Sequence, residues 1–141
     1  MPKEILLVAN KTAGGAALRD HVRHLMQEEE CHFTLLVPAT PPNEHATWTD
    51  DEAIGHARQR CAEVCRAFAA MGADIEGRVG DMNPFEAIGD VLREKHMDLI
   101  VLSTLPPGIS KWLHRDLPAR IERNYSVPLT TIIGVEEAAH A

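Results

Sequence analysis

The order of apolar and polar segments between Ile75 and Ile133 most constrains what this chain can fold into. This stretch predicts, in chain order, a strand, a helix, a strand, a helix and a strand. Such alternation indicates a parallel sheet whose right-handed crossovers place helices on both faces. The apolar runs end in glycine or small polar residues, Gly80 after the first and Ser103-Thr104 after the second. Because ligands bind at the carboxyl ends of strands in open parallel sheets, functional residues are expected where these runs end.

Two of the expected strands, residues 4–9 and 99–102, are continuous apolar runs. Such runs are typical of strands that are buried on both faces, so the two strands belong side by side at the centre of the sheet. A more polar run over residues 74–79 contains Gly77, which favours an edge position. With further strands over residues 32–37 and 129–134, the sequence predicts an α/β fold. We expect a flavodoxin-like, Rossmann-like three-layer sandwich with a five-stranded parallel sheet in the order 3-2-1-4-5.

Capping residues mark the starts of two expected helices. Thr49 and Asn83 each precede a glutamate by three residues, which is the pattern of a capping box. Pro84 at the first helical position supports the second of these starts. Gly72 is placed to end the helix that begins after Thr49. The other helices are expected over residues 16–30 and 117–125.

Composition limits the class of protein. The 141 residues suffice for one domain with a core, and we expect residues 1–141 to form it, with 136–141 as a loose tail. The formal net charge of −7 argues against a nucleic-acid binder. No apolar run approaches the ~20 residues that cross a membrane, and a strand follows the N-terminus with no signal peptide before it. We therefore expect a cytoplasmic protein that binds neither nucleic acid nor membrane.

The cysteines and histidines form no recognisable metal motif. Cys61 and Cys65 lie on or beside an apolar stripe of helical spacing, and we expect them, like Cys31, to be small core residues. His21 and His24 lie three residues apart on one helix and could contact the same ligand. Because zinc sites need three or four protein ligands and no third is evident, a solvated helix face is favoured and no metal ligand is assigned.

Two loops should meet at the switch point between the first and fourth strands, over residues 10–15 and 103–111. Gly14 and Gly15 would let backbone N–H groups approach an anion at the start of a helix. An alternative stays open: the two glycines only form a turn, and the basic residues Lys111, His114 and Arg115 only cap a helix or contact solvent. Side chains suited to phosphate in these loops are Lys11, Thr12, Ser103, Thr104, Ser110, Lys111, His114 and Arg115.

Sharper motifs are absent. No Gly-x-Gly-x-x-Gly follows the first strand, and there is no Walker lysine motif, so a dinucleotide oxidoreductase and a P-loop enzyme are disfavoured. No carboxylate pair ends the first strand, which argues against a magnesium-dependent phospho-receiver. No serine or cysteine lies in a nucleophile elbow. We therefore assign no catalytic residue.

Four segments spread over nearly the whole chain carry a family resemblance. They are Ile5-Leu6-Leu7-Val8-Ala9-Asn10, then Val79-Gly80-Asp81 with Pro84 to Ile88, then Asp98-Leu99-Ile100-Val101-Leu102-Ser103-Thr104, and Val127-Pro128 before the last strand. Together they resemble the universal stress protein family. The resemblance implies the five-stranded flavodoxin-like sheet and a homodimer through the last strand, Leu129 to Ile133. That strand is also an apolar edge, and bare edges invite pairing.

The chain departs from this family where its nucleotide-binding members hold their ligand. The resemblance implies an acidic residue at the place of Asn10, and Gly-x2-Gly-x9-Gly-Ser/Thr after the fourth strand. Ser103 stands at the place of the first glycine of that motif. Pro106 and Pro107 crowd the second, and proline has no N–H to donate. His114-Arg115-Asp116 stands where Gly-Ser/Thr is implied, so a bound anion would depend on Lys111, His114 and Arg115.

Three functional hypotheses remain. The first is a dimeric regulatory module that binds a nucleotide such as ATP or AMP, or a related phosphate ligand, without rapid turnover. The second is a protein-interaction module with a vestigial pocket, and the third is a slow nucleotide hydrolase with His114 or Asp81 as its base. For the first, the residues expected to bind the ligand are Ala9, Asn10, Lys11, Thr12, Val37, Ala39, Gly80, Ser103, Thr104, Gly108, Ser110, Lys111 and Arg115.

Overall fold

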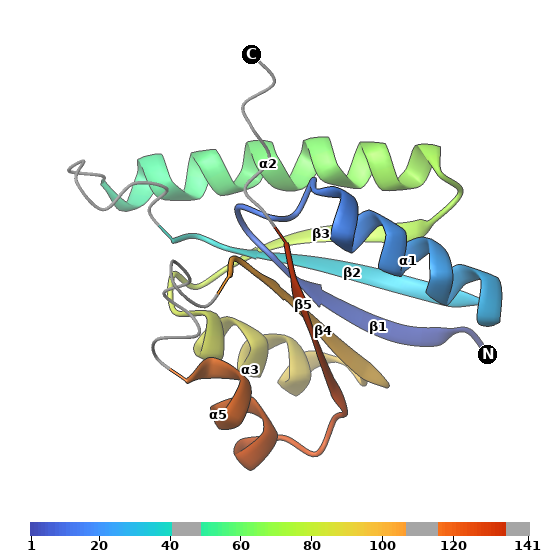
Figure 1. Cartoon of the computed structure of the whole chain (residues 1–141). Coiled ribbons are helices and arrows are strands. Elements are labelled where there is room, and N and C mark those ends of the chain that lie inside the picture. The colour runs from blue at the N-terminus through green and yellow to red at the C-terminus, as the bar shows by residue number, and fades with distance from the viewer. Residues whose placement is uncertain (41–48, 107–115, 135–141) are drawn as a thin grey trace.

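The computed structural model describes residues 1–40, 49–106 and 116–134 (Figure 1). Its strands are β1 (Lys3–Val8), β2 (Cys31–Pro38), β3 (Asp74–Gly80), β4 (Leu99–Thr104) and β5 (Leu129–Ile133). Its helices are α1 (Ala16–Glu28), α2 (Asp50–Ala70), α3 (Pro84–Glu94) and α5 (Leu117–Asn124). The tail expected over residues 136–141 lies outside the described residues.

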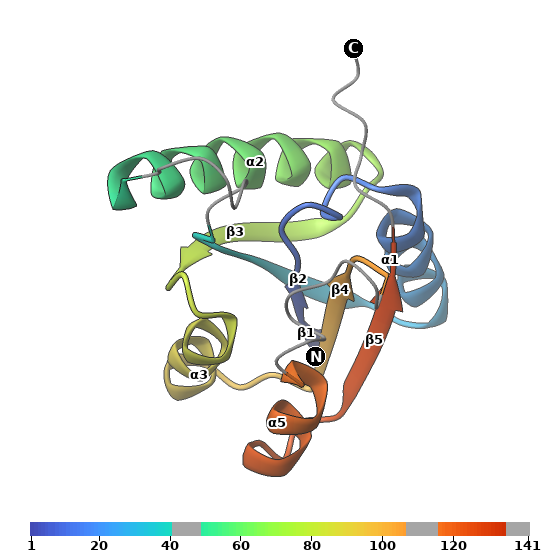
Figure 2. The ribbon, with the colours of Figure 1, turned by 60° about the vertical axis from the view of Figure 1, so that its left-hand side comes forward.

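The five strands form one sheet in the order β3-β2-β1-β4-β5, and each neighbouring pair is parallel. Helices α1 and α2 lie over one face and α3 and α5 over the other, which makes three layers (Figure 2). The expected α/β fold and strand order are therefore confirmed. Because β1 pairs with β2 on one side and β4 on the other, the strand order reverses between β1 and β4. The switch point expected from the sequence lies there.

Strand β1 contributes to the core on both faces of the sheet. Ile5, Leu7 and Ala9 pack in the cluster under α1 and α2, whereas Leu6 and Val8 pack in the cluster over α3 and α5. All five side chains are fully buried. Full burial of each valine, leucine or isoleucine side chain stabilises the fold by about 1.5–3 kcal/mol. The two-sided burial explains why residues 4–9 are apolar without alternation.

Helix α2 begins and ends where its sequence predicted. The Thr49 side chain accepts a hydrogen bond from the Glu52 N–H at 3.1 Å, and the Glu52 carboxylate accepts one from the Thr49 N–H at 3.4 Å. This reciprocal pair is the expected capping box. Gly72 lies just beyond the helix with φ of +96°, a conformation that glycine adopts without steric cost.

The start of α3 corrects one expectation. The Asn83 side chain accepts from the Phe85 N–H at 3.0 Å, one residue earlier than a capping box requires. The Asn83 N–H, which Glu86 would have bound, instead donates to the Asp81 carboxylate at 2.8 Å. Asn83 is therefore the N-cap, but Asp81 rather than Glu86 completes the local bonding.

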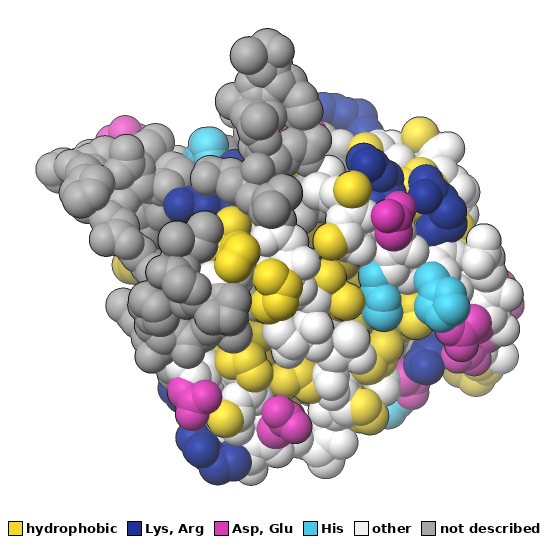
Figure 3. Space-filling model, in the orientation of Figure 1, with side chains coloured by type: hydrophobic (Ala, Val, Ile, Leu, Met, Phe, Trp, Pro, Cys, Tyr) yellow, Lys and Arg dark blue, Asp and Glu magenta, His cyan; other side chains and the backbone are white. Residues whose placement is uncertain are grey.

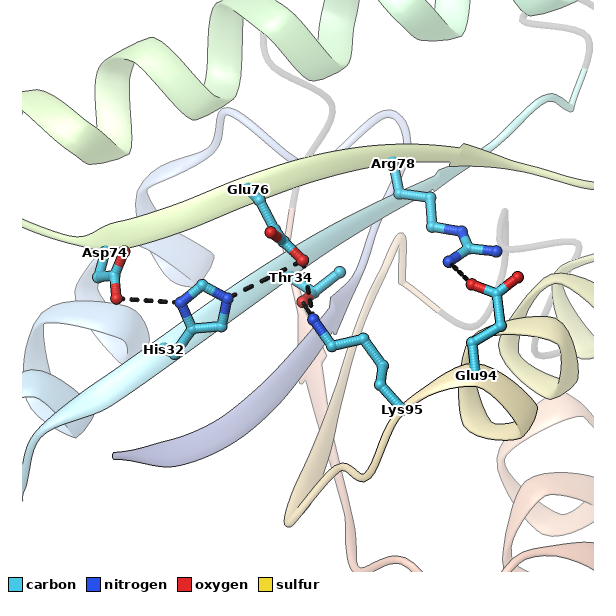
Figure 4. A network of polar contacts seen from close by, with 7 residues as sticks. All are labelled: His32, Thr34, Asp74, Glu76, Arg78, Glu94 and Lys95. Carbon is cyan, nitrogen blue, oxygen red and sulfur yellow. Dashed lines mark hydrogen bonds and ion pairs between the residues drawn. The ribbon is translucent and has the colours of Figure 1, made fainter. Parts of the chain in front are cut away.

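Strand β3 is the polar edge that the sequence predicted. Ion pairs link it to the neighbouring strand β2 and to the end of α3 (Figure 4). His32 lies 3.0 Å from Asp74, and Lys95 donates to Glu76 at 2.8 Å and to Thr34 at 3.3 Å. Arg78 pairs with Glu94. The hydrogen bond from Lys95 holds the pKa of the Glu76 carboxyl below its usual value. Each exposed ion pair of this kind stabilises the folded protein by at most about 1 kcal/mol. The network therefore contributes little to holding β3 in the sheet.

Cys61 and Cys65 lie on α2, which covers β3 on the other face of the sheet. Cys61 is buried and Cys65 is half-buried, as expected for small residues on and beside an apolar stripe. Burial raises the pKa of the Cys61 thiol, and burial together with the neighbouring Cys61 raises the pKa of Cys65 to about 12. Both cysteines are therefore neutral thiols at physiological pH.

Candidate functional site at the carboxyl ends of β1 and β4

The turn after β1 carries the first group of candidate residues. The Ala9 N–H donates to the Leu36 carbonyl at 3.2 Å, which keeps the chain beside β2 for one residue beyond the strand. The Asn10 carbonyl then accepts from the Ala13 N–H, and the Thr12 carbonyl from the Gly15 N–H, both at 3.1 Å. The Gly15 amide is thus used by the turn itself, as the turn-only interpretation of the two glycines expects. Lys11 lies between these bonds with a half-buried side chain.

Asn10 ties the turn to β2 and to α2. Its side-chain nitrogen donates to the Pro38 carbonyl at 2.8 Å and to the Thr40 hydroxyl at 2.7 Å. Its side-chain oxygen accepts from the Arg60 guanidinium. Both amide hydrogens are used, whereas among the described residues only Arg60 donates to the oxygen, which has two lone pairs. With 7 % of its surface exposed, Asn10 holds three segments together and can accept one further hydrogen bond.

Thr12 and Ser103 join the ends of β1 and β4. Their hydroxyl oxygens lie 2.6 Å apart, and both side chains are buried. Ser103 and Thr104 were expected in the loop after the fourth strand, but β4 runs through both of them. The strand is longer because β5 continues beside it: Ser103 and Thr104 are in register with Ile132 and Ile133. The direct contact shows that the turn after β1 and the end of β4 lie side by side at the switch point.

The ends of β2 and β3 form the adjoining part of the site. The Ala39 N–H donates to the Gly80 carbonyl at 3.0 Å, and Val37 and Ala39 are both buried. A Cβ at Gly80 would lie 2.8 Å from atoms of Ala87 and Leu36. Glycine is therefore required here for the packing of α3 against β2, whether or not a ligand also approaches it.

The remaining candidates divide into two groups. Gly108, Ser110, Lys111, Arg115 and His114 lie outside the described residues. Asp81, the other base considered for hydrolysis, is exposed and accepts the Asn83 N–H. Among the described residues, no three His, Cys, Asp or Glu side chains come together as metal ligands. Within those same residues, no helix combines the length and apolar character of a membrane span.

Sequence reasoning missed Arg60 and Thr40. Both bind Asn10 from segments distant in the sequence, α2 and the end of β2. Arg60 follows Ala57 by three residues and precedes Val64 by four, so it borders the buried stripe of α2. An arginine at helical spacing from buried positions was the available signal, because such a side chain must reach over the sheet or along its end.

Comparison with known proteins places this fold. No protein-family model matches the chain, and no curated protein sequence matches it. Solved structures do match over almost the whole chain. A universal stress protein from Archaeoglobus fulgidus aligns with a TM-score of 0.64 and 17% identity, covering 94% of each chain. A universal stress protein solved in complex with cAMP aligns with a TM-score of 0.60 and 19% identity, covering 94% of this chain and 97% of the other.

A third match is a hypothetical protein, PH0823, with a TM-score of 0.53 and 22% identity, covering 98% of this chain and all of the other. These matches define the class of fold: the chain has the α/β fold of the universal stress proteins. The resemblance expected from the sequence is confirmed at that level. At these identities the shared property is the fold, and ligand and activity need arguments from this chain's own residues.

Proposed function

We propose that this protein is a universal stress protein-like regulatory module that binds a nucleotide, or a related phosphate ligand, between β1 and β4. The observation that carries the proposal is the contact of Thr12 with Ser103, which brings polar side chains of the turn after β1 and the end of β4 together at the switch point. Ligands of open α/β sheets bind at such a point. A protein of the same fold was solved with cAMP, which supports a nucleotide as the ligand class.

The described residues suggest how a nucleotide would be held. The free lone pair of the Asn10 oxygen suits a ribose hydroxyl or a base N–H, while Arg60 and Thr40 fix its orientation. Val37, Ala39 and Ala9, which are buried in the ligand-free structure, would line the pocket for a base, with Gly80 beside them. Ser103, Thr104, Lys11 and Thr12 would face the sugar and phosphates. Phosphate charge would be met mainly by Lys111 and Arg115, and Gly108 and Ser110 are their neighbours in the sequence.

Calorimetry of the nucleotide-free protein against ATP, AMP and cAMP tests this proposal. We expect heat of binding with at least one of the three. A variant with Lys111→Ala and Arg115→Ala should bind more weakly, because the ligand loses two phosphate contacts. Arg66→Ala is the matched control, since Arg66 is an exposed cation on α2. Absence of heat with all three ligands at millimolar concentration would remove the nucleotide proposal.

A second candidate function is dimerisation without a ligand, and the edge strand β5 favours it. Thr131 and Ile133 are exposed, and Ile133 exposes 45 % of its surface. Figure 3 shows hydrophobic side chains gathered on the face of the molecule where β5 lies. A bare apolar edge strand is a surface for pairing with a second copy. We propose that Leu129 to Ile133 forms the homodimer contact.

Light scattering with two matched variants tests the dimer. Ile133→Lys places a charge on the edge and should convert a dimer to a monomer. Met82→Lys is the control, because Met82 is an equally exposed hydrophobic residue in the β3–α3 connection. A wild-type protein that is monomeric at micromolar concentration, or a dimer that survives Ile133→Lys, would contradict the proposal.

A further inference from the structure

A groove runs along the β3 edge of the sheet, on the face covered by α2. It has a volume of about 480 Å³ and is lined by Arg58, Cys61, Cys65, Gly77, Arg78 and Val79, with Ala62 at its wall. None of these residues was a candidate for the nucleotide site. Gly77 lies mid-strand and pairs with Leu35, three residues before the end of β3. The groove is therefore a feature separate from the site at the carboxyl ends of the strands.

Two thiols converge at the floor of this groove. Cys61 and Cys65 lie four residues apart on α2, so they project from the same side of the helix. A Cβ added to Gly77 would lie 2.5 Å from the Cys61 sulfur and 2.9 Å from the Cys65 sulfur. Only a glycine leaves room for both sulfurs against the backbone of β3.

The two sulfurs differ in access. Cys61 exposes 6 % of its surface and its thiol donates to the Leu35 carbonyl at 4.0 Å, so the packing around it fixes its position. Cys65 is half-buried and lines the groove, so it is reachable from solvent. One fixed and one accessible sulfur make a pair that a small ion can enter without opening the core.

The number and type of ligands select the ion. Thiolates prefer soft metals, and among the described residues no group of three potential ligands exists. Zinc usually takes four ligands, at least three of them from the protein, and iron–sulfur clusters take four, so neither fits a bare pair. Cu(I) is soft and accepts two sulfur ligands. We propose that Cys61 and Cys65 bind one soft monovalent ion of the Cu(I) type as a dithiolate.

The charges around the pair are consistent with such a complex. Binding releases two protons to solvent, one from each thiol, and forms two metal–sulfur bonds. Two thiolates and one monovalent cation carry a net charge of −1. Arg58 lies exposed at the groove, where its guanidinium can offset that charge. The Arg78 guanidinium instead pairs with Glu94.

Competition titration tests the proposal. The reduced, oxygen-free protein would be titrated with Cu(I) held by bicinchoninate, and ultraviolet absorption from sulfur-to-copper charge transfer would be followed. We expect one ion per chain. Cys65→Ser should lower the affinity by roughly 100-fold or more, since a hydroxyl is a hard and weak ligand for Cu(I). Cys31→Ser is the matched control: its thiol donates to the Leu25 and Glu29 carbonyls at the other end of β2 and should not matter.

Two further variants keep the test decisive. Gly77→Ala should weaken binding because its Cβ displaces both sulfurs, and Cys61→Ser should weaken it because one of the two sulfur ligands is lost. If Cys61→Ser does not fold, Cys65→Ser decides the matter. Folding of each variant would be checked by circular dichroism. A protein that cannot take Cu(I) from bicinchoninate would overturn the proposal. A Cys65→Ser variant that binds Cu(I) as tightly as the wild type would overturn it as well. Loss of binding in Cys31→Ser would overturn it too, because the ion would then lie elsewhere.

Discussion

The hydrogen bond between Thr12 and Ser103 should be energetically coupled. Both hydroxyls are buried and lie 2.6 Å apart, so removing one leaves the other without that partner inside the protein. Such an orphaned group costs about 1–3 kcal/mol. Ser103→Ala and Thr12→Val should each destabilise the protein by that amount, which lowers the melting temperature by roughly 3 °C per kcal/mol in a chain of this size.

The double variant gives the sharper result. When both hydroxyls are replaced, no buried group is left unpaired, and the loss should be much smaller than the sum of the two single losses. Urea unfolding of the four proteins measures the difference, and we expect a coupling energy of about 1 kcal/mol or more. Single losses that add within about 0.3 kcal/mol would refute the contact, and with it the proximity of the turn after β1 to the end of β4.

Three other predictions follow from the same structure. Thr49→Ala should cost about 1 kcal/mol in urea unfolding by removing the α2 capping box, whereas a loss near zero would contradict the cap. Asn10→Ala should cost about 1–3 kcal/mol, because Pro38, Thr40 and Arg60 all lose a partner, and an unchanged stability would mean that this clamp is not formed. Because Lys95 lowers the pKa of Glu76 in the folded state, the stability this carboxylate adds is present above the carboxyl's ordinary pKa and is lost as pH falls through the lowered value. Glu76→Gln should therefore flatten the acid side of the stability curve by about 0.2–1 kcal/mol, and a curve identical to the wild type would contradict the pairing.

The fold could be predicted because its signals are local. Residues 4–9 are apolar without alternation, and this marks a strand covered on both faces. Polar residues and Gly77 mark β3 as an edge, and Thr49 and Gly72 mark the ends of α2. Each of these signals depends on neighbours in the sequence, so no tertiary contact was needed to interpret it.

The site was only partly predictable, because its contacts are made between distant segments. The sequence places Asn10 and Ser103 at one edge of the sheet, but nothing near Asn10 indicates that Arg60, 50 residues away, will bind it. Gly77 was interpreted as a weak point in an edge strand. In the structure it is the surface against which two thiols pack, a role that depends on the register of α2 against β3.

The proposed nucleotide site can be tested most directly by amide chemical shifts. A ¹⁵N-labelled protein would be titrated with AMP and with ATP, and the shifted residues mapped on the sheet. We expect the largest shifts at the carboxyl ends of β1 and β4, at the amides of Asn10, Lys11, Thr12, Ser103 and Thr104. Shifts confined to the α2–β3 groove, or none at millimolar nucleotide, would contradict a nucleotide site between β1 and β4.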